Sequence, residues 1–315
     1  MAHLTSYMTL TGEFSGRINL TIMNTIDGKN GARLPLSERI PPHAFFVGSA
    51  IFHYLGPSFA VLLFARVPVA GVAWLRIVSA ALVFALWRRP WRAFFAAPRR
   101  AQATMLALGG VFALMNYSFY QAIAALPLST VAAIEFIGPV ALALAGAQSR
   151  RNLVALGLTA AGVALLTKVR FGGAPEAFFW AFANAALFTA YIVLAHAVSR
   201  ADPATSPIDR LGAAMIVAGV AISPLGLRDA APALMDPIAL GAGLAVGLSS
   251  SVIPYVFDQL AMARLPRATY ALFVALLPAT AVIIGMLVLR QMPTSVEIQG
   301  VALVAAGVAL HRPPD

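Results

Sequence analysis

From His43 onward the chain is a succession of apolar segments about 20 residues long, separated by Pro, Gly and Arg. An α-helix of about 20 apolar residues crosses the hydrocarbon core of a bilayer, which is roughly 30 Å thick. Only helices and closed barrels satisfy all of their backbone hydrogen bonds inside lipid, and segments of this length fit helices. The sequence therefore predicts an all-α polytopic membrane protein.

The composition supports this class and excludes others. Hydrophobic residues make up 60% of the 315 residues, charged residues make up 11%, and the mean hydropathy is +0.82. In soluble domains about a quarter of the residues are charged. The net charge of +10 does not indicate nucleic-acid binding, because the arginines form short clusters between apolar segments instead of a stripe with aromatics. With no cysteine, disulfides, thiolate metal sites and cysteine nucleophiles are excluded.

Punctuation by Pro, Gly and Arg divides the apolar region into about ten expected helices. Residues 1–43 are polar and are expected to form a flexible N-terminal extension without a usable motif. The expected spans are 44–65, 69–87, 103–124, 128–147, 152–168, 175–197, 208–227, 238–262, 267–289 and 296–311.

The Lys and Arg residues are unevenly divided between the two sets of alternating connections. Clusters such as Arg88-Arg89 and Arg150-Arg151 fall on the side of the N-terminus. Connections with more Lys and Arg stay in the cytoplasm, so both termini are predicted to be cytoplasmic. The opposite side has only Arg66, Lys168, Arg170, Arg228 and Arg290.

An internal repeat relates the two halves. The hexapeptide 160–165 (Ala-Ala-Gly-Val-Ala-Leu) recurs at 305–310, and Leu126-Pro127 recurs as Leu265-Pro266. Thr130 and Pro139 have counterparts in the same order, Thr269 and Pro278. Because five helices per unit is an odd number, the second copy enters the membrane from the opposite face, as in many secondary transporters. We expect a 5+5 inverted repeat with units 44–168 and 175–311.

Two charges lie inside expected spans, at the same depth. Arg76 and Glu135 both sit about 10 Å below the outer end of their helices, at 1.5 Å per residue. Charged groups inside a membrane are costly and usually mark functional sites or pair with each other. Two interpretations stay open: a structural ion pair, or Arg76 binding a substrate carboxylate while Glu135 binds an ammonium group or carries a proton.

Further polar side chains recur on helical faces. Spacing by four places two polar pairs on neighbouring faces of the third span, which indicates either a cavity lining or interhelical hydrogen bonds. Prolines inside spans remove an amide donor and are expected to act as hinges. The candidates for substrate binding or coupling are Asn116 with Tyr120, Tyr117 with Gln121, Tyr191 with the weaker Asn184, and Tyr255, Asp258 and Gln259; the expected hinges are Pro139, Pro254 and Pro278.

These residues resemble a known family over roughly 44–311. The halves are similar to EamA domains of the drug/metabolite transporter superfamily, and within it to bacterial threonine/homoserine exporters. The resemblance implies a ten-helix carrier of the bacterial inner membrane that exports small metabolites, amino acids such as threonine and homoserine above all, by alternating access. It rests on Leu75-Arg76, Arg89-Pro90-Trp91-Arg92, Met115-Asn116-Tyr117, Phe119-Tyr120, Glu135-Phe136, Gly138-Pro139, Pro254-Tyr255 with Asp258, and Arg264-Leu265-Pro266.

Two positions depart from the family pattern. Leu277-Pro278 stands where such exporters often have Glu-Pro, so a second carboxylate near the centre is missing. Arg290-Gln291 replaces the usual Gly-Glu, and we expect this change to concern only a loop.

Other functions remain as alternatives. Efflux of drugs or polyamines is the main one, and proton antiport stands beside facilitated exit down a gradient. An intramembrane enzyme is disfavoured because no Gly-x-Ser-x-Gly, His-Glu-x-x-His or phosphate-binding loop occurs. A structural subunit would need neither buried charges nor an inverted repeat. The expected partners are a small-molecule substrate, protons and the bilayer, without cofactor, metal or nucleic acid; monomer and homodimer both stay open.

Overall fold

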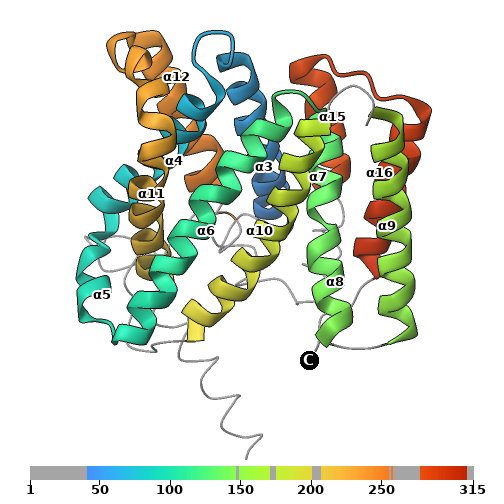
Figure 1. Ribbon diagram of the computed structural model, residues 1–315, viewed down its shortest axis with the longest axis horizontal. Helices are drawn as coiled ribbons and strands as arrows, with labels where there is room; N and C mark the ends of the chain where they lie inside the picture. Colours follow the sequence, from blue (N-terminus) through green and yellow to red (C-terminus); the bar gives the residue numbers. More distant parts are fainter. Residues whose placement is uncertain are drawn as a thin grey trace, which may run out of the picture.

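The computed structural model describes residues 41–146, 149–170, 175–200, 207–254, 257 and 277–310, and every element in these ranges is helical (Figure 1). The elements are α3 (Pro42–Leu63), α4 (Val69–Arg88), α5 (Trp91–Ala96), α6 (Arg99–Ile123), α7 (Leu128–Glu135), α8 (Ile137–Gly146), α9 (Arg150–Arg170), α10 (Pro175–Arg200), α11 (Pro207–Met235), α12 (Pro237–Gly247), the π-helix η2 (Leu248–Val252), α15 (Leu277–Leu289) and α16 (Ser295–Leu310).

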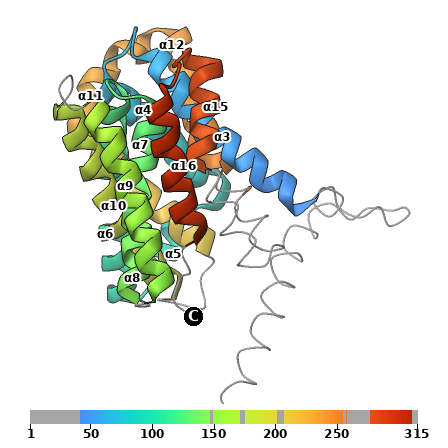
Figure 2. The same ribbon diagram turned by 90° about the vertical axis from the view of Figure 1, so that its right-hand side faces the viewer.

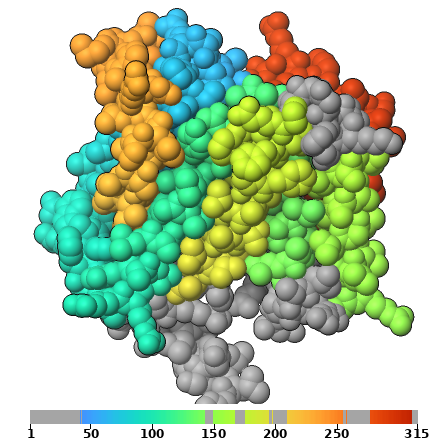
Figure 3. Space-filling view, in the orientation of Figure 1, coloured from blue at the N-terminus to red at the C-terminus, as the bar shows by residue number. Residues whose placement is uncertain are grey.

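The helices run up and down between two ends of one bundle. At the upper end of Figure 1 lie the connections from α3 to α4, α6 to α7, α11 to α12 and α15 to α16. The short helix α5 and the end of α8 lie at the lower end. On the face shown in Figure 3, α10 crosses the molecule beside α6. The alternation predicted from the sequence is thus present in the described residues.

Within the described residues, five helices are long and apolar enough to cross a membrane: α3, α4, α6, α10 and α11. Shorter apolar helices cover 128–142, 237–252, 277–289 and 295–310. These helices fall in the segments expected from hydropathy, so the prediction of an all-α polytopic fold is confirmed.

The end of one helix lies well beyond its expected position. Helix α11 continues through Pro224 and Pro232 to Met235, whereas the sequence predicted an end at 227. It ends there because Asp236 accepts a hydrogen bond from the amide of Ile238 at 2.9 Å and so caps the next helix. Proline at position 237 then starts α12, where a missing amide costs nothing.

The sequence analysis missed helix α5, which has only six residues. Arg89 ends α4 in the left-handed conformation, with φ of 49°, and the following Pro90 precedes α5. Asp209, in the first turn of α11, accepts hydrogen bonds from Arg88 Nε at 2.8 Å and Arg88 Nη2 at 3.3 Å. This bidentate ion pair joins α4 to α11 at the lower end.

Helices that are equivalent in the proposed repeat pack against each other. Helix α9 packs on α16 and α4 on α11, and Figure 2 shows α16 beside α9. Gly162 of the first hexapeptide faces Gly300, and a Cβ at Gly162 would lie 2.5 Å from the Gly300 carbonyl oxygen. Gly307 of the second hexapeptide faces Thr159 in the same way. Such reciprocal contacts are expected of two related halves; the assignment of the repeat boundaries stays a prediction.

Candidate functional site

Arg76 is buried on α4, with 8% of its surface exposed. Its Nε donates to Ser251 Oγ at 3.2 Å, and its Nη2 donates to the backbone carbonyl of Ser250 at 3.1 Å. Both acceptors belong to η2, and the guanidinium also lies 5.4 Å from the ring centroid of Tyr120. A buried guanidinium needs such partners to offset its lost hydration.

The π-helix and Pro254 explain why a backbone carbonyl is available to Arg76. In an α-helix the carbonyl of residue 250 would accept from the amide of residue 254, which proline lacks. The chain instead forms a π-turn over Leu248–Val252, in which the amide of Ile253 bonds to the carbonyl of Leu248. The freed carbonyl of Ser250 accepts from Arg76. Pi-helical turns occur frequently at functional sites.

Glu135 occupies the last position of α7, where a second proline interrupts a helix. Pro139 cannot donate to the carbonyl of Glu135, four residues earlier, so the helix breaks at Phe136 and resumes as α8. The Glu135 side chain is 9% exposed. Its Oε1 accepts a hydrogen bond from Asn184 Nδ2 of α10 at 3.2 Å. The interruption thus places one carboxylate in the middle of a broken span.

Arg76 and Glu135 are not joined by an ion pair. The two ion pairs found among the described residues are Arg66–Asp236 and Arg88–Asp209, with a limit of 4.0 Å between nitrogen and oxygen. The Arg76 charge still acts on Glu135 electrostatically, so the two groups lie within electrostatic range of each other. The structural-pair interpretation therefore does not describe this conformation.

Buried polar atoms without partners surround these two charges. The Tyr120 hydroxyl and Asn184 Oδ1 have no hydrogen-bond partner within the described structure, and both side chains are fully buried. Tyr54 of α3 is also buried and lies within electrostatic reach of Glu135. A buried polar atom without a partner costs free energy. A bound ligand that supplies the missing hydrogen bonds would remove this cost.

The remaining candidates of the third span are less close to the charges. Asn116 is buried and donates to the carbonyl of Phe112 in its own helix at 2.8 Å. Tyr117 packs edge-on against Trp180 of α10, with ring centroids 5.6 Å apart. Gln121 is half-buried, and no contact ties it to either charge in the described residues.

Tyr191 of α10 belongs to an aromatic cluster. Its ring stacks on Phe188 at 6.1 Å and lies 5.8 Å from Phe112. These contacts join α10 to α6. The candidates Tyr255, Asp258 and Gln259 lie outside the described residues. Pro278 lies in the first turn of α15, and the residues before Leu277 are also outside the described range, so its role as a hinge stays a prediction.

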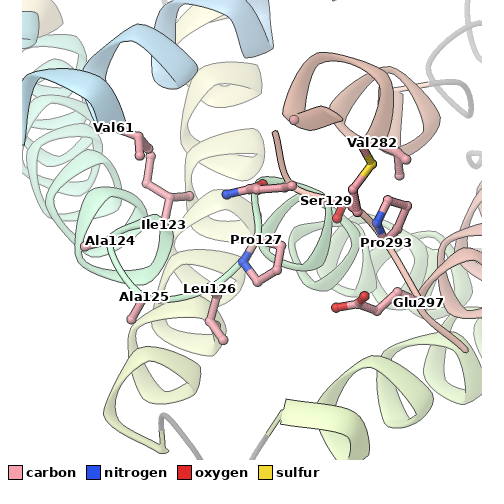
Figure 4. A pocket seen from close by; sticks show the side chains of 13 residues that line it. Val61, Ile123, Ala124, Ala125, Leu126, Pro127, Ser129, Val282, Pro293 and Glu297 are labelled. Carbon is pink, nitrogen blue, oxygen red and sulfur yellow. The ribbon is translucent and has the colours of Figure 1, made fainter. Parts of the chain in front are cut away.

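A pocket of about 230 Å³ lies at the upper end, away from both charges (Figure 4). It lies between the α6–α7 turn, with Pro127 and Ser129, and the α15–α16 connection, with Gln291 and Pro293. Gln291 Oε1 accepts a hydrogen bond from the amide of Leu128 at 3.2 Å. The expectation that Gln291 concerns only a loop is therefore incomplete, because its side chain joins the two halves at the start of α7.

Sequence reasoning missed three residues of the central site. Tyr54 follows His53 in the first span, but a single tyrosine in an apolar helix is not distinctive. Ser250 and Ser251 stood out more, since Ser249-Ser250-Ser251 is a polar run inside an apolar span, three residues before Pro254. A rule that searches for polar runs just before intramembrane prolines would have found them.

The comparisons with known proteins agree with this architecture. Residues 176–311 match the model of the EamA-like transporter family. The threonine/homoserine exporters RhtA of Salmonella typhimurium and Escherichia coli are 32% and 31% identical over 264 residues, which cover 80% of this chain and 85% of each exporter. A solved crystal structure superposes on 86% of this chain and 97% of its own with a TM-score of 0.55; its identity of 18% shows the fold alone.

The chain is all-helical in its described residues and has long apolar spans. Its buried arginine and buried carboxylate lie at interrupted helices, which fits a transporter. The described residues form no recognisable catalytic site. The resemblance over 44–311, the family model matched in the second half and the relatives over most of the length agree. The chain is a multi-pass membrane protein and belongs to the EamA-like transporter family, whose members are transporters and not enzymes.

Proposed function

We propose that this protein exports small amino acids, with threonine and homoserine as the first candidates, by alternating access across a bacterial inner membrane. The observation that carries the proposal is that Arg76 and Glu135 are buried on different helices, within electrostatic range of each other, and are held by separate neutral partners instead of by each other. An amino-acid zwitterion has one group of each sign. It can therefore bridge two protein charges that do not neutralise each other.

Each group has a role in this proposal. Arg76 receives the substrate carboxylate. Glu135 receives the ammonium group. The Tyr120 hydroxyl and Asn184 Oδ1, which lack partners within the described residues, are available to a hydroxyl on the substrate side chain. The names of the relatives support substrates of this kind, since both are threonine/homoserine exporters.

Two helix interruptions supply the flexibility that alternating access needs. The break between α7 and α8 carries Glu135, and the π-helix η2 carries the acceptors of Arg76. Interrupted helices at ion and substrate sites are a recurring feature of secondary transporters. The pocket described above contains neither Arg76 nor Glu135, which suits a closed site.

The arginine distribution supports the orientation. Arg89, Arg92, Arg99 and Arg150 lie at the lower end, next to α5 and the start of α9. This end is proposed to be cytoplasmic, with both termini on the same side. Glu135 is proposed to alternate between substrate and a proton, which makes the export a proton antiport. Efflux of organic cations is the second candidate, and the nearby Arg76 disfavours it because it repels them.

The test is efflux of labelled threonine or homoserine from vesicles that contain the purified protein, with and without an imposed pH gradient. Wild-type efflux should exceed that of empty vesicles and rise with the gradient, and Glu135→Gln should abolish the rise. Met292→Ala, a change at an exposed side chain, is the matched control and should behave as wild type. No efflux of either amino acid by folded wild-type protein would overturn the proposed substrates.

A further inference from the structure

A second pocket, of about 450 Å³, opens on the side of the bundle between α3 and α12. We call it the lateral groove. It is lined mainly by apolar side chains, among them Phe59, Leu62, Ile238 and Ala242, and its volume is within the roughly 300–1,000 Å³ of typical ligand pockets. Phe59, Leu62 and Ile238 are 45%, 54% and 68% exposed, so the groove faces outward.

The lining residues of the groove follow the direction of α3. Along α3 it extends from Phe52 to Arg66, which is about 20 Å at 1.5 Å per residue. One leaflet of the hydrocarbon core is half of roughly 30 Å. An apolar groove of this length, on the side of a membrane-spanning bundle, fits one acyl chain that lies along the helices.

Two opposite charges meet at the upper rim of the groove. Arg66 Nη1 and Asp236 Oδ2 are 3.7 Å apart, and the two side chains are 59% and 42% exposed. Charge-assisted hydrogen bonds are usually about 2.7–2.9 Å long, so this contact is loose. Figure 3 shows the chain around the end of α3 next to the α11–α12 region at the top of the molecule. The charges lie where the head group of a lipid in the groove would lie.

We propose that the lateral groove binds a phospholipid with a zwitterionic, primary-amine head group. Its acyl chain lies between α3 and α12, its phosphate accepts hydrogen bonds from the guanidinium of Arg66, and its ammonium donates to Asp236 Oδ2. Arginine binds phosphate through two parallel N–H donors. An anionic head group gains Arg66 but is repelled by Asp236, and a trimethylated ammonium has no N–H to donate.

The two carboxylate oxygens of Asp236 have different partners. One oxygen, Oδ1, accepts from the amide of Ile238 and caps α12, while Oδ2 points to the exposed Arg66. Asparagine retains the capping oxygen and removes the charge. Asp236→Asn therefore separates the lipid contact from helix capping, and this inference does not depend on what the protein transports.

The experiment is native mass spectrometry of the purified full chain after equilibration with equimolar phosphatidylethanolamine, phosphatidylglycerol and phosphatidylcholine of identical acyl chains. Wild type should retain the ethanolamine lipid about fivefold over either competitor. Asp236→Asn should reduce this preference to less than about twofold, and Arg66→Gln should lower retention of all three. Arg228→Gln, on an exposed arginine outside the groove, is the charge control and should leave the preference unchanged.

A second pair of variants tests the acyl chain. Ala242→Phe fills the groove and should reduce retained lipid severalfold, whereas Leu287→Phe adds bulk at an exposed position of α15 outside the groove and should not. Equal retention of all three lipids by wild type would overturn the proposal, and so would a preference that survives Asp236→Asn. Equal loss in the two phenylalanine variants would place the lipid elsewhere and would equally overturn it.

Discussion

Arg76 is held by the carbonyl of Ser250, with 3.1 Å between Nη2 and the oxygen, and that carbonyl is free because the residue four positions later is Pro254. A helix irregularity in the second half of the chain thus fixes a charge of the first half. Glu135 has a related setting, since Pro139 interrupts the helix at the following residue. Both charges of the proposed substrate site therefore depend on a proline.

The first prediction concerns Pro254→Ala. Alanine restores an amide that can bond to the Ser250 carbonyl and compete with Arg76. A hydrogen bond to a charged group contributes about 1.5–3 kcal/mol, so substrate affinity should fall roughly tenfold or more. The melting temperature should not fall, because a helical proline is removed. Affinity measured by substrate-induced thermal shift checks both parts, and unchanged affinity would refute the link between Pro254 and Arg76.

The second prediction concerns Asn184, which donates to Glu135 at 3.2 Å. Asn184→Ala should weaken substrate binding by about 1–3 kcal/mol, because the buried carboxylate loses its donor. In a Glu135→Gln background the same change should cost less than in wild type, because a hydrogen bond to a neutral acceptor contributes only about 0.5–1.5 kcal/mol. A double-mutant cycle of substrate affinities measures the difference. Additive effects would show that Asn184 acts separately from Glu135.

The third prediction concerns Gln291, whose Oε1 accepts from the amide of Leu128. Gln291→Ala should destabilise the upper end by about 1 kcal/mol, the usual cost of losing a side chain that caps a helix start. Amide hydrogen exchange around Leu128 should become faster, while exchange at the lower end stays the same. Met292→Ala is the control next to it, at a side chain that is 75% exposed. Unchanged exchange at Leu128 would contradict this role of Gln291.

The fourth prediction concerns the packing of α9 on α16. A Cβ at Gly162 would lie 2.5 Å from the Gly300 carbonyl, so Gly162→Ala should lower the melting temperature by forcing the helices apart. Gly157, on the same helix, has no atom within 4 Å of such a Cβ. Gly157→Ala should therefore stabilise the protein by roughly 0.5–1 kcal/mol, as alanine does in helices. Thermal unfolding in one detergent compares the two, and equal effects would argue against the close contact.

Features that depend on residues close together in the chain could be predicted from the sequence, whereas contacts between distant residues could not. Helix positions follow from hydropathy, and the break at Phe136 follows from Pro139, because both are local effects. The equal depth of Arg76 and Glu135 also follows from counting along two helices. Their partners do not, because hydrogen bonds between distant helices depend on how each helix is rotated. Arg76 and Ser250 are 174 residues apart in the chain, and Leu128 and Gln291 are 163 apart.

The helix α5 and the length of α11 show a second limit. A six-residue helix between two spans has too few positions for a periodic pattern. The end of α11 depends on the cap formed by Asp236, while the sequence shows a nearer charge pair, Arg228-Asp229, that suggests an earlier end. At the end of α11, a side-chain cap thus counts for more than the hydropathy signal.

The central claim is that Arg76 binds the carboxylate and Glu135 the ammonium group of an amino-acid substrate. Competition against labelled threonine efflux measures this most directly, with threonine, its alcohol analogue without the carboxylate and its hydroxy-acid analogue without the amine as competitors. In wild type only threonine should compete well. Arg76→Gln should lose the preference for threonine over the alcohol, and Glu135→Gln the preference over the hydroxy acid. If both variants discriminate between the analogues as wild type does, the two charges do not bind the substrate.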